Sequence, residues 1–139
     1  YQGINSRLDE IQAGFLNIKL KYLDKENKHR RSIARLYLEN IKNDKIQLPY
    51  WDGSENHVFH VFVVQIKNRI DFQEYLTQNN IQSSIHYPIP PHQQEAYKNE
   101  QWGPFPITEQ IHQEIISLPI SPVLAANEAK RVIEVCNKY

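Results

Sequence analysis

Apolar side chains recur at spacings of three and four positions along the first forty residues, which is the pattern of helices with one apolar face. It predicts one helical segment up to about Tyr22, with Ser6 as its N-cap, and a second up to Ile41. Residues 24–31 are wholly polar, so we expect a bend there. A helical segment this long extends beyond a compact core, and we therefore expect its apolar face to pack on something outside this chain.

The rest of the chain alternates short strand and helix patterns. Residues 57–66 are β-branched and aromatic on both alternating faces, which is typical of a central strand covered on both sides. After it we predict a helix that begins with Asp71 and Glu74, a strand at 81–85 and a short helix at 93–97. A helical turn or two between Ile107 and Ile115 and an edge strand at 116–118 follow. The chain ends in a helix with Cys136 on its inner face. This order predicts an α+β fold, a small antiparallel or mixed sheet covered by helices.

Residues 85–92, Ile-His-Tyr-Pro-Ile-Pro-Pro-His, follow the second of these predicted strands. Proline restricts the backbone and removes amide donors, so this loop presents two imidazoles and a phenol from a stiff, non-repetitive segment. Loops of this kind often carry binding residues. A rigid connection between a strand and a short helix would have the same composition, and composition alone does not separate the two interpretations.

Composition and charge narrow the classes of function. The 139 residues make about one domain, and sixteen basic residues balance sixteen acidic ones, so no net charge favours nucleic acid or a membrane surface. Acidic residues interrupt the basic cluster between Lys25 and Arg35, which we interpret as a solvated helix face. No apolar run is long enough to span a bilayer. The single cysteine fits a reducing compartment, and the absence of methionine indicates a piece of a longer protein.

Self-contained catalytic signatures are missing from the sequence. Its four glycines are scattered singly, so there is no glycine-rich phosphate loop, and there is no Gly-x-Ser-x-Gly elbow. His57 and His60 lie three positions apart on a predicted strand and should point to opposite faces, which excludes a chelating pair. Cys136 falls on an apolar helix face and is expected in the core. The residues alone therefore predict no metal site and no catalytic residue.

Five motifs, taken in order, resemble a known family. They are Gly3-Ile4-Asn5-Ser6-Arg7-Leu8-Asp9-Glu10-Ile11-Gln12-Ala13, Arg30-Arg31-x-Ile33-Ala34-x-x-Tyr37, His60-x-Phe62-Val63, Ile85-His86-Tyr87-Pro88 and Ser117-Leu118-Pro119. Together they are similar to the C-terminal part of the DegT/DnrJ/EryC1/StrS family, the pyridoxal-phosphate-dependent nucleotide-sugar aminotransferases. The amino-acid sequence of the loop at 86–92 is most similar to that of members that aminate 3-keto-6-deoxy sugars on dTDP. The resemblance covers essentially the whole chain.

The resemblance implies the type I aminotransferase fold in a homodimer. Residues 1–43 would link to a large cofactor domain and the dimer interface, and residues 44–139 would form the small C-terminal α+β domain. The family's Schiff-base lysine would lie upstream of this chain, so the chain alone should neither hold pyridoxal 5'-phosphate nor catalyse. The full-length, cytoplasmic enzyme would transfer an amino group from an amino acid, glutamate in this family, to a keto-sugar nucleotide for cell-surface polysaccharide, lipopolysaccharide or natural-product sugars.

The resemblance also implies roles for individual residues. Asn5 matches the asparagine that reaches the cofactor phosphate from the neighbouring subunit, and an amide at a helix N-terminus suits an anion; capping the helix is its alternative role. Arg7 would reinforce this cofactor-binding surface or form an interface salt bridge. His86 and Tyr87 match the segment that lines the sugar-nucleotide site, where they would orient the substrate and not transfer protons. His92 is a further candidate for substrate binding.

A non-catalytic binding, dimerisation or regulatory module with the same fold is the alternative to an enzyme. The full-length sequence separates the two interpretations. A lysine upstream of Asn5, in the context of a cofactor domain, supports the aminotransferase, and its absence would exclude one.

Overall fold

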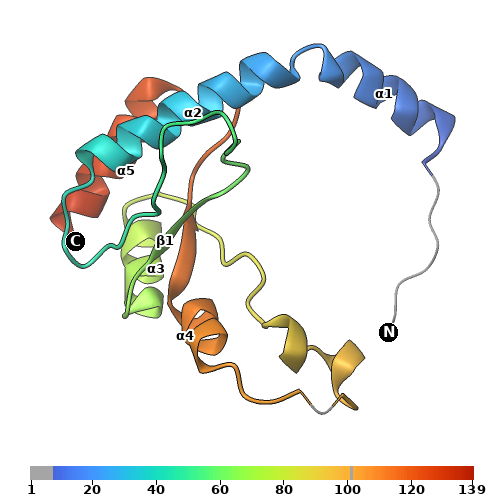
Figure 1. The fold of residues 1–139 in the computed structure, drawn as a ribbon. Helices are drawn as coiled ribbons and strands as arrows, with labels where there is room; N and C mark the ends of the chain where they lie inside the picture. Colours follow the sequence, from blue (N-terminus) through green and yellow to red (C-terminus); the bar gives the residue numbers. More distant parts are fainter. Residues whose placement is uncertain (1–7, 101) are drawn as a thin grey trace.

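The computed structural model describes residues 8–100 and 102–139. Two consecutive N-terminal helices form an arm. The second helix lies over a small sheet with further helices beside it, and the first extends beyond the sheet (Figure 1). The elements are α1 (Glu10–Leu20), α2 (Leu23–Asn40), β1 (Phe62–Gln65), α3 (Arg69–Gln78), the 3-10 turns η1 (Pro91–Gln93) and η2 (Glu95–Tyr97), α4 (Pro106–Glu114), β2 (Ile115–Leu118) and α5 (Ala126–Lys138). This arrangement confirms the predicted α+β class. Within these residues, no helix is both long enough and apolar enough to cross a membrane.

β1 and β2 pair antiparallel, with Phe62 opposite Leu118 and Val64 opposite Ile116. These four side chains are buried and point to the same face of the sheet, because side chains alternate along a strand. A single bridge between Ser84 and Ser117 extends the pairing along the outer side of β2. The short strand predicted at 116–118 is thus confirmed, but it is not an edge strand, because Ser117 has a partner on each side. Ser117 projects from the face opposite the core.

The core lies between the sheet and the helices α2, α3 and α5. Tyr37 and Phe62 pack edge to face, with ring centroids 5.0 Å apart, and both are fully buried. The Tyr37 hydroxyl donates a 2.7 Å hydrogen bond to the Pro119 carbonyl, and burial raises the pKa of this phenol. The chain beyond β2 is therefore fixed to α2 by a satisfied polar contact inside the core.

Cys136 lies on the buried face of α5, as predicted, together with Ala129, Val132 and Ile133. Burial raises the pKa of its thiol to about 12, and thiolate is the reactive form of cysteine. We expect the folded chain not to react with a thiol-specific colorimetric reagent at pH 8 and to react fully in denaturant. Rapid labelling under native conditions would contradict this placement.

The strand predicted at 57–66 is wrong in its first half, because the ladder of β1 begins only at Phe62. Phe59 adopts a left-handed conformation with φ of 48°, and its amide donates to Nδ1 of His57 at 2.9 Å. This local turn takes residues 57–60 out of the sheet. His57 and His60 are consequently not on opposite faces of a strand. No cluster of three or more metal-binding side chains occurs in the described part of the chain.

Two further elements differ from the predictions. The strand expected at 81–85 reduces to the single bridge at Ser84, and α3 begins at Arg69 after Asn68, not at Asp71. Asp71 instead accepts a hydrogen bond from the hydroxyl of Tyr139. The spacing of Asp71 and Glu74 resembles a capping box, but the Asp71 carboxylate binds a residue 68 positions away in the sequence and does not cap the helix.

The arm bends before its polar stretch and not within it. α1 and α2 separate at residues 21–22, while residues 24–31 continue as helix, with Glu26 and Arg30 paired at i,i+4. The cap of α1 is Asp9, whose carboxylate accepts the amide of Gln12 at 2.7 Å. Ser6, the predicted cap, lies outside the described residues.

The basic cluster of α2 is only partly solvated. Lys25, Lys28 and Arg35 are exposed, as expected for a solvated face. Arg31, by contrast, forms a 3.0 Å salt bridge with Glu55. Nε2 of His29 hydrogen-bonds the Leu124 carbonyl at 2.8 Å. Part of the cluster therefore holds loops onto α2.

Apolar side chains on the arm have little cover within this chain. No residue of α1 is buried, and α1 projects away from the sheet (Figure 1). The apolar arm face is exposed by 42–73% per residue and consists of Leu8, Ile11, Phe15, Leu16, Ile18, Leu20, Tyr22 and Leu23. Exposed apolar patches of this kind mark interaction surfaces.

Candidate functional site

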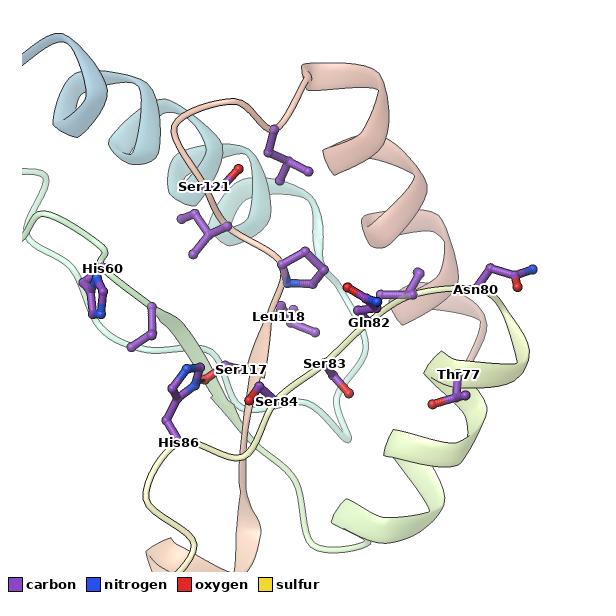
Figure 2. A pocket seen from close by; sticks show the side chains of 15 residues that line it. His60, Thr77, Asn80, Gln82, Ser83, Ser84, His86, Ser117, Leu118 and Ser121 are labelled. Atoms are coloured by element: carbon purple, nitrogen blue, oxygen red, sulfur yellow. Dashed lines mark hydrogen bonds between the residues drawn. The ribbon is translucent and has the colours of Figure 1, made fainter. Parts of the chain in front are cut away.

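A pocket of about 850 Å³ opens beside the Ser84–Ser117 bridge (Figure 2). Its walls come from the turn before β1, the segment after α3 and the end of β2. The lining residues are His60, Val61, Thr77, Asn80, Ile81, Gln82, Ser83, Ser84, His86, Ser117, Leu118, Pro119, Ile120, Ser121 and Leu124. Its polar groups are hydroxyls, amides and two imidazoles, and the lining contains no Lys, Arg, Asp or Glu. Such a lining suits the uncharged polar groups of a ligand.

His86 is the one residue of the three substrate-binding candidates that lines this pocket. Its Nδ1 and the hydroxyl of Ser117 form a 2.8 Å hydrogen bond, seen in Figure 2 between the loop and β2. Ser117 is only 5% exposed, whereas the His86 side chain is half-buried. One ring nitrogen of His86 is thus engaged by the sheet, which leaves Nε2 for another partner.

Tyr87 differs from His86, because its backbone carbonyl is hydrogen-bonded whereas its side chain is exposed to solvent. The residue has a left-handed φ of 60°, which costs energy for a residue with a Cβ. Nδ1 of His112, on α4, donates to its carbonyl at 2.6 Å. The side chain is 77% exposed and lies outside the pocket lining. The conformation directs the Tyr87 side chain outwards at the point where the loop leaves the sheet.

His92 packs on α4 and not into the pocket. Its Nε2 lies 3.0 Å from Oε1 of Glu109, and its ring contacts Phe105 edge to face at 4.9 Å between centroids. The side chain of His92 is only 11% exposed. The structure therefore does not bring His92 together with His86, and the contacts of His92 fix the far end of the loop.

The pair of His92 and Glu109 predicts a pH dependence. The hydrogen bonds from His92 and from the Phe105 amide lower the pKa of Glu109 below its ordinary value of 4.5. A carboxyl with a lowered folded pKa stabilises the fold above its unfolded pKa and loses that contribution as the pH falls through the folded value. We expect hydrogen exchange in residues 91–105, corrected for intrinsic rates, to accelerate below pH 4.5.

Two variants distinguish the contact between His92 and Glu109 from destabilisation of the whole fold by acid. Glu109→Gln should remove most of the pH dependence in residues 91–105. Asp52→Asn should leave it intact, although the pKa of Asp52 is also lowered, by hydrogen bonds from Ser54. Equal acid sensitivity in the wild type and Glu109→Gln would contradict the assignment.

Comparisons with known proteins show the family of this chain. Residues 1–137 match the sequence pattern of the DegT/DnrJ/EryC1/StrS aminotransferase family. The chain belongs to this family. It is 56% identical, over its whole length and 38% of the relative, to the dTDP-3-amino-3,6-dideoxy-α-D-galactopyranose transaminase of Aneurinibacillus thermoaerophilus. It therefore spans little more than a third of the length of that curated relative.

Solved structures of aminotransferases share the fold. DesV of S. venezuelae superimposes with a TM-score of 0.88 at 35% identity, covering 99% of this chain and 38% of DesV. NtdA of Bacillus subtilis, solved with bound PMP cofactor, superimposes with a TM-score of 0.78 at 29% identity, covering 96% of this chain and 33% of NtdA. Over the part that it covers, the α+β chain therefore shares the fold of the fold type I aminotransferases of the DegT/DnrJ/EryC1/StrS family.

Within the described residues, no lysine lies beside His86 where it could hold the cofactor. Every lysine in them is exposed at the surface, and none lines the pocket beside His86. A Schiff-base lysine needs a partly desolvated setting that lowers its pKa. Asn5 and Arg7, the cofactor-binding candidates, lie outside the described residues, and their roles remain predictions.

Three residues at this site escaped prediction from sequence: Ser117, Glu109 and His112. Ser117 was part of the Ser117-Leu118-Pro119 motif that carried the resemblance, but no role was attached to it. Strand alternation could have placed it opposite Ile116 and Leu118, on the face away from the core. No local pattern marks Glu109 or His112, which meet the loop only through tertiary packing. His60, interpreted as a structural strand histidine, lines the pocket.

Proposed function

We propose that this chain is the small domain of a pyridoxal-phosphate-dependent aminotransferase that acts on keto-sugar nucleotides, with glutamate as amino donor. The observation that carries the proposal is the placement of His86 at an uncharged, hydroxyl-rich pocket, in a chain 56% identical to a dTDP-sugar transaminase. Neutral hydroxyl and imidazole groups match the hydrogen-bonding needs of a sugar. The cofactor supplies the amine-transfer chemistry, while residues of this chain bind and orient the substrate.

The direct test uses the full-length protein that contains this chain. Incubated with pyridoxal 5'-phosphate, glutamate and a dTDP-3-keto-6-deoxyhexose, it should produce 2-oxoglutarate and the amino sugar nucleotide in equal amounts, measured by mass spectrometry. The 139-residue chain alone should yield neither product and no protein-bound cofactor absorbance. Absence of turnover by the full-length protein, or turnover by the chain alone, would contradict the proposal.

The uncovered arm supports a second part of the proposal, namely that residues 1–43 link this domain to a large cofactor domain and a dimer interface. The apolar arm face includes Ile11, Phe15 and Leu20, each at least 65% exposed, and burying such residues is favourable by about 1.5–3 kcal/mol each. In the full-length homodimer the rest of the polypeptide would cover this face. A non-catalytic dimerisation or regulatory module would use the same face without the upstream lysine.

Alone, the 139-residue chain should self-associate through the apolar arm face. Light scattering coupled to size exclusion should show a mass that increases with protein concentration. Phe15→Glu should shift the chain toward the monomer, because a charge in the buried interface is costly. The control Val123→Glu adds the same charge at an apolar residue that is 86% exposed and lies off the arm. A monomer at all concentrations, or equal effects of both variants, would contradict this assignment.

A further inference from the structure

Ser117 is a serine that the fold buries, with 5% of its surface exposed. Its backbone pairs with Val63 of β1 on one side. On the other side, it donates its amide to the Ser84 carbonyl at 2.8 Å and accepts the Ser84 amide at 3.3 Å. Both neighbours along the strand, Ile116 and Leu118, point into the core. The sheet therefore fixes the backbone of Ser117 and the face from which its side chain projects.

This hydroxyl meets His86, which follows two residues after the bridged Ser84. Residues two apart in an extended segment point to the same face, and this face is the one from which Ser117 projects. The resulting hydrogen bond to Nδ1 is 2.8 Å long. Whichever partner donates, the bond occupies Nδ1 and restricts the rotation of the imidazole.

The surroundings of His86 leave its second ring nitrogen, Nε2, available to a ligand. Within the described residues, no hydrogen bond reaches Nε2, and the pocket contains no charged side chain to compete for it. The Ser83 hydroxyl in the same lining is buried and lacks a partner in this part of the chain. Buried polar groups are normally satisfied, so the pocket offers oriented groups to an incoming polar ligand.

We propose that Ser117 is a positioning residue, which holds the His86 ring so that Nε2 is the nitrogen offered to the substrate. The inference rests on the proposed function, because it requires a sugar nucleotide at the His86 loop. It assigns to Ser117 a role that is exerted through the orientation of the His86 ring.

The test uses the full-length enzyme and an isosteric pair of variants. Ser117→Thr keeps the hydroxyl and Ser117→Val replaces it with a methyl group, and both β-branched residues suit a strand. The Val variant should raise the KM for the keto-sugar nucleotide about threefold to tenfold, the effect of one lost hydrogen bond, with a smaller change in kcat. The Thr variant should stay near the wild-type KM. Ser32→Ala, which removes a 2.7 Å hydrogen bond from the surface of α2, should leave KM unchanged.

A double variant distinguishes positioning from a merely structural role. If Ser117 acts through His86, the variant His86→Ala/Ser117→Val should have the same KM as His86→Ala alone. Additive effects, or equal KM values for the Thr and Val variants, would overturn the inference while the proposed function stands. If His86→Ala itself leaves KM unchanged, the substrate role of the loop fails, and the positioning role fails with it.

Discussion

Replacing His86 with alanine in the full-length enzyme is expected to raise the KM for the keto-sugar nucleotide roughly tenfold to a hundredfold, since leaving a buried partner unpaired costs about 1–3 kcal/mol. His86 lines the pocket, and its Nδ1 is already bound to Ser117. The variant therefore removes one oriented group from the substrate side. The absorbance of the bound cofactor and the rate of its reaction with glutamate should not change.

Steady-state kinetics with each substrate, together with cofactor absorbance, measure this separation. Lys130→Ala is a suitable control, because it removes an exposed side chain on α5 that does not line the pocket of His86. Tyr87→Phe should give a smaller increase in KM for the sugar nucleotide, because its exposed phenol loses only one hydroxyl. Loss of cofactor in His86→Ala would place the loop on the cofactor side and contradict the assignment.

Replacing Asn5 with alanine should have the complementary result. If Asn5 reaches the cofactor phosphate, its loss removes a hydrogen bond to a charged group, which is worth about 1.5–3 kcal/mol, or roughly tenfold to a hundredfold in the Kd of pyridoxal 5'-phosphate. Equilibrium dialysis followed by absorbance measures this Kd. Once cofactor is saturating, the KM for the sugar nucleotide should be close to that of the wild type.

A matched control is available at the other end of the chain. Asn127→Ala removes an exposed asparagine from the first turn of α5 and should leave the Kd of the cofactor unchanged. Equal cofactor affinity in Asn5→Ala and the wild type would leave helix capping as the role of Asn5 and contradict the phosphate contact.

Elements with a clear helical period were predictable from sequence. The apolar stripe of α5 that contains Cys136 is buried as expected, and α4 occupies the region of the predicted helical turns. The strand at 57–66 failed because composition indicates β-propensity but not where a ladder begins. The left-handed Phe59 and its contact with His57 end the extended segment, and only the folded backbone reveals them.

The candidate site was predictable only in part. The proline-rich loop and the family resemblance pointed to His86, which the structure places at the pocket. Its partners could not be predicted, because Ser117 lies 31 residues from His86 and His112 lies 25 residues from Tyr87. Neither distance corresponds to a helix or strand period, so both contacts arise from tertiary packing. His92 was grouped with His86 by sequence proximity, yet it contacts Glu109 on α4.

A crystal structure of the full-length enzyme with its cofactor and an amino sugar nucleotide product tests the central claim most directly. The claim is that the loop at 85–92 forms one wall of the sugar-nucleotide site. It predicts an oxygen of the ligand at hydrogen-bond distance, about 2.7–3.2 Å, from Nε2 of His86, with Nδ1 still bound to Ser117. A sugar nucleotide bound with no contact to residues 85–92 would contradict the claim.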